Sequence, residues 1–283
     1  MSVAVPEGST VMRRQLGAEL ERLRTAAGVR MERAAQALDC ARSKISHIEN
    51  GRYGVKLPDL EALLRLYGAY DRLDDLDAMR RAGVQPGWWS RYDLPSWLGD
   101  LIGLEQSCQR ERVVELELVP ALLQTEAYVR AVHQLGPVEL LPAEIDRKVT
   151  VRLERQKILA PPHSMELSAV ISEAALLRVA ADGGVGAEQL RKLVDEAARP
   201  NVSLRVLPLA AGLHAVSGSF AVLDFPPEVR FKIAYEESAV GGRLVDDESV
   251  VQALSRMHDR LRSQALSDKD SLALVTRLSQ QRN

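Results

Sequence analysis

The sequence predicts an all-α N-terminal domain followed by a larger α+β C-terminal domain. Three observations lead to this fold class. The first part shows four or five short helical patterns within about 70 residues. After residue 110, strand-like and helical runs mix without the strict strand–helix alternation of a doubly wound sheet. Between the two regions, Pro86-Gly87 breaks the chain and an aromatic cluster follows it.

The size and charge of the chain set the first limits. Its 283 residues fit one large domain or two smaller ones, and 46% hydrophobic content is typical of a globular protein. The formal net charge is only −2, but the stretch from Val11 to Lys56 holds ten basic and five acidic residues. A basic N-terminal part on an acidic remainder is the electrostatic pattern of a small DNA-reading module.

Several classes of protein are disfavoured. The two cysteines, Cys40 and Cys108, form no metal-like pair and no disulfide framework. The N-terminus lacks the basic and apolar regions of a signal peptide. No apolar run approaches the roughly 18 residues of a membrane span. We therefore expect a soluble, cytoplasmic protein with no membrane association.

The N-terminal elements follow from helical spacing and from helix-ending residues. We expect residues 1–10 to be a disordered tail and residues 11–84 to be the helical domain. The predicted helices run from Met12 to Ala27, ended by Gly28, then from about Met31 to Leu38 and from about Arg42 to Glu49. A further helix begins at Pro58, with an apolar stripe of Leu60, Leu63, Leu64 and Tyr67.

Residues 85–110 are an aromatic-rich linker or docking segment. All three tryptophans lie here, at Trp88, Trp89 and Trp97, together with Tyr92 and Pro95. Large aromatic side chains dominate contacts between domains, so a packing anchor between the two domains is the favoured interpretation. Stacking on a ligand is the alternative.

Residues 111–283 form the predicted α+β domain, which we expect to be a sensor or interaction domain. Strands are predicted at Val113–Val119, Met165–Ile171, Val202–Leu207, Ser219–Phe225, Arg230–Glu236 and Gly242–Val245. Helices are predicted at Leu122–Val132, Ala143–Leu159, Ala187–Ala198, Glu248–Gln264 and Ser267–Gln280.

The second and third predicted helices have the pattern of a helix-turn-helix. The first of this pair offers a small face for close packing, at Ala34, Ala35 and Leu38. The other buries Ile45 and Ile48, three positions apart. Its opposite face carries only side chains that donate or accept hydrogen bonds, namely Arg42, Ser43, Ser46, His47 and Asn50. Such a helix suits a major groove about 12 Å wide, although an ordinary amphipathic surface helix has the same pattern.

A more specific signal lies in the run from Val29 to Gly51, VRMERAAQALDCARSKISHIENG, and in the Leu57-Pro58 pair and leucine-rich helix after it. This stretch closely resembles the helix-turn-helix of the Cro/phage-repressor (XRE) family, over roughly Arg13 to Tyr70. The resemblance implies double-stranded DNA as a partner and a role in transcription regulation.

The sequence departs from this family at four positions. Arg30 and Met31 stand where the family usually has Ser or Thr and a Gln that helps to hold a phosphate. Ala41 replaces a capping Ser, which costs about 1 kcal/mol. Asp39 replaces the usual turn Gly. None of these changes weakens a core position, but the affinity of the isolated module is expected to be modest.

Chemistry assigns roles within the helix-turn-helix. Arg42 and Ser43, at the start of the second helix, are expected to meet base edges. Ser46 and His47 suit bases or phosphates. The basic side chains around the helix are expected to hold phosphates and fix the register. The predicted DNA-binding residues are Arg30, Arg42, Ser43, Lys44, Ser46, His47, Asn50, Arg52 and Lys56. Glu49 is acidic, so an internal cap or salt bridge that braces the motif is its better interpretation.

No catalytic pattern was found, so we expect no enzyme, no metal and no cofactor. The five histidines, His47, His133, His163, His214 and His258, include no pair with the helical spacing of zinc ligands. The glycines at 183–186 are followed by no P-loop lysine. Residues 217–219 match no nucleophile elbow. The paired carboxylates of Glu236 and Glu237 are interpreted as a solvated strand end.

The rest of the chain also resembles a known group. The resemblance rests on five sequence segments, namely Trp88-Trp89, ELVPALLQT at 117–125, RLERQ at 152–156, NVSLRVLPL at 201–209 and GSFAVLDF at 218–225. They are similar to the C-terminal domain of unknown function in actinobacterial WhiJ-like regulators. In that group the domain is described as antitoxin-like, because many members lie beside a small partner protein. Val119-Pro120-Ala121 departs from a commoner Pro-Gly.

Two interpretations of the C-terminal domain stay open. In the first, it senses a small molecule or a partner protein and changes DNA affinity. In the second, it is an interaction platform whose main role is to bind a small partner protein, with autoregulatory DNA binding. A polar cavity near Gln124, Arg155, Gln156 and Tyr235 favours sensing, whereas a flat apolar face favours a platform. A homodimer is expected in either case, because one module reads only a few base pairs.

Overall fold

The computed structural model describes residues 9–162, 164–229, 231–238 and 241–280. The chain divides into two compact units, one of residues up to 107 with 225–231, the other of residues 108–224 and 232–283. Residues 1–8 of the predicted tail lie outside the described residues. Residues 9 and 10 are helical and Thr10 is buried, so the tail prediction is wrong for these two residues.

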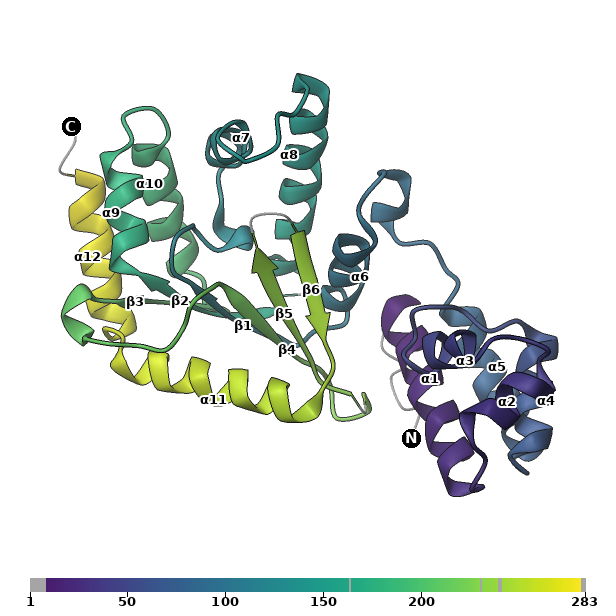
Figure 1. Cartoon of the computed structure of the whole chain (residues 1–283). Helices are drawn as coiled ribbons and strands as arrows, with labels where there is room; N and C mark the ends of the chain where they lie inside the picture. Colours follow the sequence, from purple (N-terminus) through teal and green to yellow (C-terminus); the bar gives the residue numbers. More distant parts are fainter. Residues whose placement is uncertain (1–8, 163, 230, 239–240, 281–283) are drawn as a thin grey trace. The chain divides into compact units, whose positions relative to one another are not determined.

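The regular elements of the first unit, within the described residues, are all helices (Figure 1). Its elements are α1 (Ser9–Ala26), α2 (Met31–Ala37), α3 (Arg42–Glu49), α4 (Leu57–Leu66), α5 (Leu73–Ala82), α6 (Ser96–Glu105) and the 3₁₀ turns η1 (Tyr70–Arg72) and η2 (Trp88–Arg91). One core joins α1 to α5, with Leu20, Leu60, Leu64 and Leu76 fully buried. The predicted all-α domain and its helices are confirmed, because the spacing of leucines marked a buried stripe on each.

The aromatic segment packs within this first unit. An ideal Cβ at Gly103 of α6 would lie 2.9 Å from Trp89 Cζ2 and 2.1 Å from Thr10 Oγ1 of α1. Gly99, one turn earlier, also faces the indole of Trp89. The segment was expected to be a linker that docks one domain on the next. Within its own unit, Trp89 packs on the flat surface that two glycines of α6 leave. The docking role between domains stays a prediction, and α6 itself was not anticipated.

The second unit contains one mixed six-stranded sheet with the order β3-β2-β1-β4-β5-β6. Its strands are β1 (Arg110–Glu115), β2 (Glu166–Ser172), β3 (Val202–Leu207), β4 (Phe220–Asp224), β5 (Ile233–Ser238) and β6 (Gly241–Val245). β1, β2 and β3 are mutually parallel, whereas β4, β5 and β6 pair antiparallel. The predicted α+β class is confirmed.

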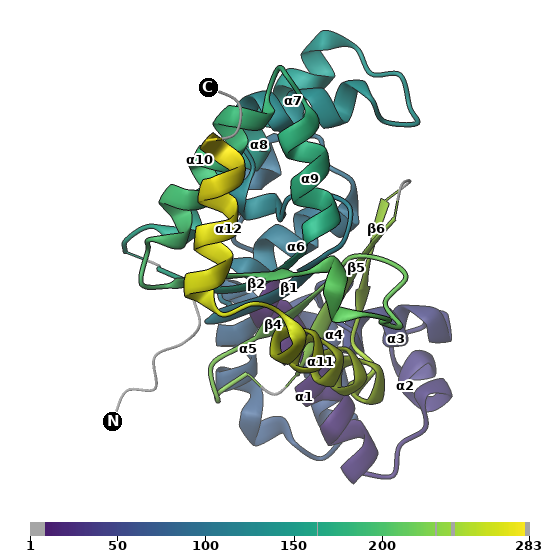
Figure 2. The ribbon, with the colours of Figure 1, turned by 90° about the vertical axis from the view of Figure 1, so that its left-hand side faces the viewer.

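Helices cover both faces of this sheet (Figures 1 and 2). They are α7 (Glu126–Gln134), α8 (Pro142–Gln156), α9 (Glu173–Ala181), α10 (Gly186–Ala197), α11 (Glu248–Gln264) and α12 (Asp268–Gln280), with the 3₁₀ turns η3 (Ala121–Leu123), η4 (Lys157–Leu159) and η5 (Leu209–Ala211). α11 covers one face, where Val251 and Leu261 pack on Val114 and Val222. α9 and α10 lie on the other face.

The connection from β3 to β4 crosses the end of the sheet. β3 lies at the edge, while β4 lies beside the central β1, so the chain must pass over the carboxyl ends of β2 and β1. We call residues 208–219 the strap. Its turn at Gly212 has a φ of 85°, a backbone conformation that favours glycine.

Several predicted boundaries in this unit are corrected. β1 starts and ends earlier than the predicted Val113–Val119, because the chain leaves the sheet at Leu116 and turns towards Pro120. The predicted helix at 122–132 is split, since Thr125 caps α7 by accepting a hydrogen bond from the amide of Tyr128 at 3.1 Å. β5 begins at Ile233, and Arg230 lies outside the described residues. α9 was not predicted.

Candidate nucleic-acid interface

The α2–turn–α3 unit is built as the helix-turn-helix pattern predicts. Ala34 and Ala35 of α2 are buried against Ile45 and Ile48 of α3. Asp39, in the turn, has a φ of 47°, the left-handed conformation for which glycine is the usual residue. Asp is among the few other residue types that adopt it readily, so the turn forms without glycine.

Two glycines let α1 lie against the carboxyl end of α3. An ideal Cβ at Gly17 would be 2.4 Å from the carbonyl oxygen of Glu49. An ideal Cβ at Gly51 would be 2.6 Å from Cα of Arg14, and Gly51 also has a φ of 64°. These contacts fix α3 against α1, which orients the opposite face of α3 outward.

Glu49 locks the same junction by an ion pair. Arg24 Nε and Nη2 donate to the two oxygens of Glu49 at 2.6 and 2.9 Å, with side chains only 12% and 4% exposed. Arg24 Nη1 also donates to the carbonyl of Val29 at 3.2 Å, which ties in the start of α2. The hydrogen bond to Glu49 raises the pKa of Arg24. The interpretation of Glu49 as an internal brace is confirmed.

The outward face of α3 carries the predicted DNA-binding side chains. Arg42, Ser43 and Asn50 are exposed, whereas Lys44, Ser46 and His47 are half-buried. Arg30 directly precedes α2, and Arg52 and Lys56 follow α3; all three are exposed. The structure therefore brings the base-edge and phosphate candidates onto one short helix and its flanks.

Two of the cations on this face already have acidic neighbours. Lys44 Nζ lies 2.9 Å from Asp59 of α4, and this hydrogen bond raises the pKa of Lys44. Arg42 Nε lies 3.3 Å from Glu32 of α2, but both side chains are more than half exposed. Exposed ion pairs contribute only about 0–1 kcal/mol, so a phosphate or a base edge can displace Glu32 at little cost.

Sequence reasoning missed Tyr53. It is 55% exposed, and its ring meets that of His47 edge-on with centroids 4.7 Å apart. Asn50 Nδ2 reaches Ser46 Oγ at 3.4 Å, so the last turn of α3 is tied internally. An aromatic residue two positions after the helix-ending Gly51, beside a polar helix face, is the signal that could have identified Tyr53.

The missing cap of α3 gives a first testable prediction. Ala41 has φ −71° and ψ 148°, the extended conformation of an N-cap, but no side chain accepts a hydrogen bond there. We expect Ala41→Ser to stabilise the first unit by about 1 kcal/mol, because a hydroxyl would accept from a free amide of the first turn. Denaturant unfolding followed by tryptophan fluorescence measures this, since all three tryptophans belong to the first unit. Ala41→Val, which adds bulk without an acceptor, must give no such gain.

In the second unit, two of the four candidate ligand residues brace the chain. Gln124 Nε2 donates to the carbonyl of Val119 at 2.7 Å, and Gln124 Oε1 accepts from Arg152 at 2.7 Å. Gln156 Nε2 donates to the carbonyl of Gln124 at 2.7 Å, while its Oε1 accepts from Lys192 at 2.6 Å. The side-chain amides of both residues are therefore used within the fold.

The other two candidates are both buried. Arg155 is 5% exposed within α8. Tyr235 is 6% exposed on β5, and its hydroxyl lies over Gly242 of β6, where an ideal Cβ would be 2.1 Å away. The hollows of the second unit described below are lined by other residues.

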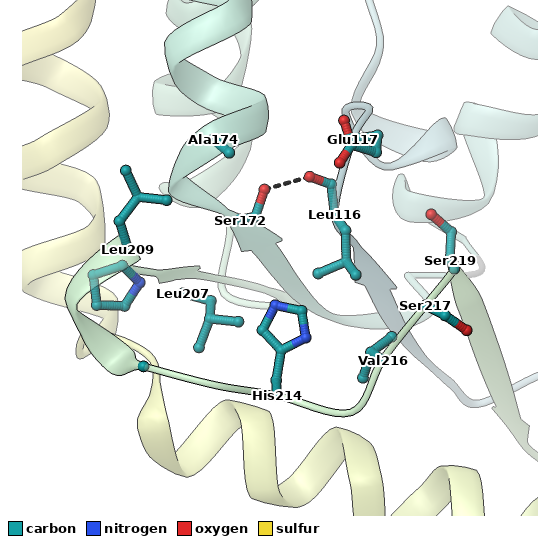
Figure 3. Close-up of a pocket in the computed structure, with 13 residues that line it drawn as sticks. Leu116, Glu117, Ser172, Ala174, Leu207, Leu209, His214, Val216, Ser217 and Ser219 are labelled. Atoms are coloured by element: carbon teal, nitrogen blue, oxygen red, sulfur yellow. Dashed lines mark hydrogen bonds between the residues drawn. The ribbon is translucent and has the colours of Figure 1, made fainter.

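A pocket of about 310 Å³ lies where the parallel strands end, beneath the strap (Figure 3). Leu116 directly follows β1, and Leu207 is the last residue of β3. His214 of the strap faces both in Figure 3. Ser172, the last residue of β2, donates to the carbonyl of Leu116 and caps α9 by accepting from the amide of Ala175 at 3.0 Å. Apolar walls with a few hydroxyls, one imidazole and the carboxylate of Glu117 suit a small molecule.

Two family models match the chain. One, described as a helix-turn-helix domain, matches residues 15–79. The other, described as a domain of unknown function (DUF5753), matches residues 98–277. No curated protein and no solved structure matches. The helix-turn-helix match suggests a DNA-binding regulator, in agreement with the exposed polar face of α3.

Two features are absent from the described residues. Among their helices, none has both the length and the apolar character that a bilayer crossing requires. Within the same residues, no three His, Cys, Asp or Glu side chains are grouped as metal ligands.

Proposed function

This chain belongs to the DUF5753 family and carries a helix-turn-helix domain ahead of that region, and we infer that the two parts act together. We propose that the chain is a sequence-specific transcriptional regulator of the XRE type. One observation carries the proposal: α3 is locked on its inner side and presents Arg42 and Ser43 outward from its first turn. The N-terminal residues of a recognition helix are those that meet base edges.

The proposed DNA-binding form is a homodimer. A single module reads few base pairs, whereas a two-fold dimer reads two half-sites about 34–36 Å apart. The uncapped α3 and the Lys44–Asp59 pair both weaken the isolated module, which supports a need for a second copy. Because it must reach the chromosome, such a regulator acts in the cytoplasm, and it acts by binding rather than by catalysis.

Arg42 and Lys56 separate base recognition from phosphate binding. We expect Arg42→Ala to lose roughly 1–3 kcal/mol on the preferred duplex and little on a scrambled one, because a bidentate contact to guanine is lost. We expect Lys56→Ala to weaken both duplexes about equally and to reduce the salt slope by about one. Titrations of both variants on both duplexes, over a series of salt concentrations, measure this. Equal losses for both variants on both duplexes would contradict the assignment.

We propose that the chain is one of the WhiJ-like actinobacterial regulators that it resembles, and that its second unit controls DNA affinity through a small molecule or a protein partner. The pocket beneath the strap supports the small-molecule version. Such coupling is typically about 1–3 kcal/mol and needs two states that bind the effector differently. The second candidate is an antitoxin-like protein that mainly binds a small partner. Selection of bound DNA with and without the candidate effector tests both, and no sequence preference under any condition would exclude the regulator.

A further inference from the structure

A second hollow lies on the other side of the strap, against α11. We call it the strap groove, and its volume is about 780 Å³. Four lining residues come from the strap and six from α11. They are Leu213, His214, Ala215, Val216, Ala253, Arg256, Met257, Arg260, Leu261 and Gln264.

The six residues of α11 form one stripe of that helix. Ala253, Met257 and Leu261 recur every four positions and supply an apolar floor. The stripe continues to Gln264, so the groove follows α11 for about 16 Å, or about three helical turns. An elongated apolar floor along a helix suits another helix better than a compact small molecule.

Leucine 213 adds an apolar wall on the strap side. Its side chain is fully exposed, at 100%, directly after the turn at Gly212. Val216 of the strap is half-buried beside it. An exposed leucine that borders an apolar groove offers surface that a partner can bury, whereas a single scattered one carries no such meaning.

The rim of the groove is basic. Arg256 and Arg260 lie one turn apart on α11, and no lining residue is acidic. Within the part of the chain that the structure describes, neither guanidinium makes an ion pair, and both side chains are exposed. Arg262 behaves differently, because it donates to Ser168 and Ser203 at 3.2 and 2.8 Å inside the unit. The unneutralised charge of α11 is thus gathered at the groove.

We propose that the strap groove binds an acidic amphipathic helix of a partner protein. Apolar residues at i, i+3, i+4 and i+7 of that helix lie between Leu213 and the floor of α11. Its flanking Asp or Glu residues pair with Arg256 and Arg260. A second copy of the same stripe would set arginine against arginine, so the charge favours a different protein. This inference rests on the proposed function in one respect, namely that the second unit takes a protein partner.

The test uses the full chain and a designed probe. The probe is a fluorescent peptide of roughly 15 residues, about four helical turns, with leucines on one face and glutamates beside them. We expect it to bind the wild type in fluorescence anisotropy, with affinity falling as salt is added. We expect Arg256→Glu with Arg260→Glu to weaken binding by roughly tenfold or more, since two attractions become repulsions. Leu213→Asp is expected to weaken it by a similar factor.

A charge-swapped peptide and a matched variant complete the test. The same peptide with lysines in place of glutamates must bind the doubly reversed variant better than the wild type. Arg147→Glu with Arg191→Glu changes the net charge equally on α8 and α10 and must leave binding unchanged. If the wild type binds neither peptide, or prefers the lysine form, the proposal fails. It also fails if the reversal at Arg256 and Arg260 instead changes the oligomeric state, because the groove would then join two copies. DNA titrations of the same variants test the regulator separately.

Discussion

Replacing Glu49 with alanine is expected to destabilise the first unit by about 3 kcal/mol or more. The change removes the buried partner of Arg24, whose side chain is only 12% exposed, and leaves its guanidinium with the carbonyl of Val29 and the distant, exposed Glu21 alone. The hydroxyl of Tyr67 is buried nearby and has no hydrogen-bond partner among the described residues. Because burial raises its pKa, it stays neutral and cannot supply the negative charge of the lost carboxylate. Because the pair ties α1 to the end of α3, DNA affinity is expected to fall as well.

Tryptophan fluorescence during denaturant unfolding measures this loss, because Trp88, Trp89 and Trp97 all report on the first unit. Glu21→Ala is the matched control. Glu21 lies 4.0 Å from the same Arg24, but its side chain is 55% exposed, so the expected cost is below about 1 kcal/mol. Equal effects for the two variants would mean that the buried ion pair does not brace the motif.

A second large effect is expected at Glu115, on β1 of the second unit. Burial raises the pKa of Glu115 to about 8, although the hydroxyl of Ser219 donates to its carboxyl. Nearby Glu237 raises the pKa further, and Arg152 lowers it. In the unfolded chain the carboxyl has its ordinary pKa of 4.5. At a pH between these two pKa values, the folded protein binds more protons than the unfolded one. The free energy of unfolding therefore falls as the pH rises through this range.

Glu115→Gln removes this dependence, because an uncharged amide of the same shape takes the place of the acid. We expect the variant and the wild type to be similarly stable near pH 4.5, and the variant to be more stable at pH 8. One pKa unit corresponds to about 1.4 kcal/mol, so the gain at pH 8 is on the order of 4 kcal/mol. Unfolding followed by circular dichroism over this pH range measures it. Glu117→Gln, at an exposed side chain two residues later, must leave the slope unchanged.

Much of the helical unit follows from the sequence because its signals are local. Leucine spacing, Gly28 and Pro58 mark the ends of helices, and a short run of residues carries the helix-turn-helix pattern. Even Glu49 could be assigned, since an acidic side chain beside a phosphate-binding face needs an internal partner. The ion pair of Lys44 could not be predicted, because its partner Asp59 is fifteen positions away on another helix.

The second unit shows where such reasoning stops. Gln124 and Gln156 lie thirty-two positions apart and come together as braces for one loop, which the sequence did not indicate. Ligand contact by either residue stays a prediction. The bracing contact depends on how α8 and α10 lie over the 119–125 loop, which no local pattern encodes. The two hollows escaped prediction for the same reason. Both are bounded by the strap, whose path depends on the order of strands in the sheet.

The strand order also affects how the chain is made. The side chain of Arg112 on β1 donates a hydrogen bond to the carboxylate of Asp224 on β4, 112 positions later in the sequence. During synthesis at roughly 5–20 residues per second, β1 therefore waits on the order of ten seconds for its antiparallel neighbour. For that interval one edge of the central strand is exposed and can pair with another nascent chain. The core of the helical unit, by contrast, is formed by residues 16–79, which follow one another closely in the sequence.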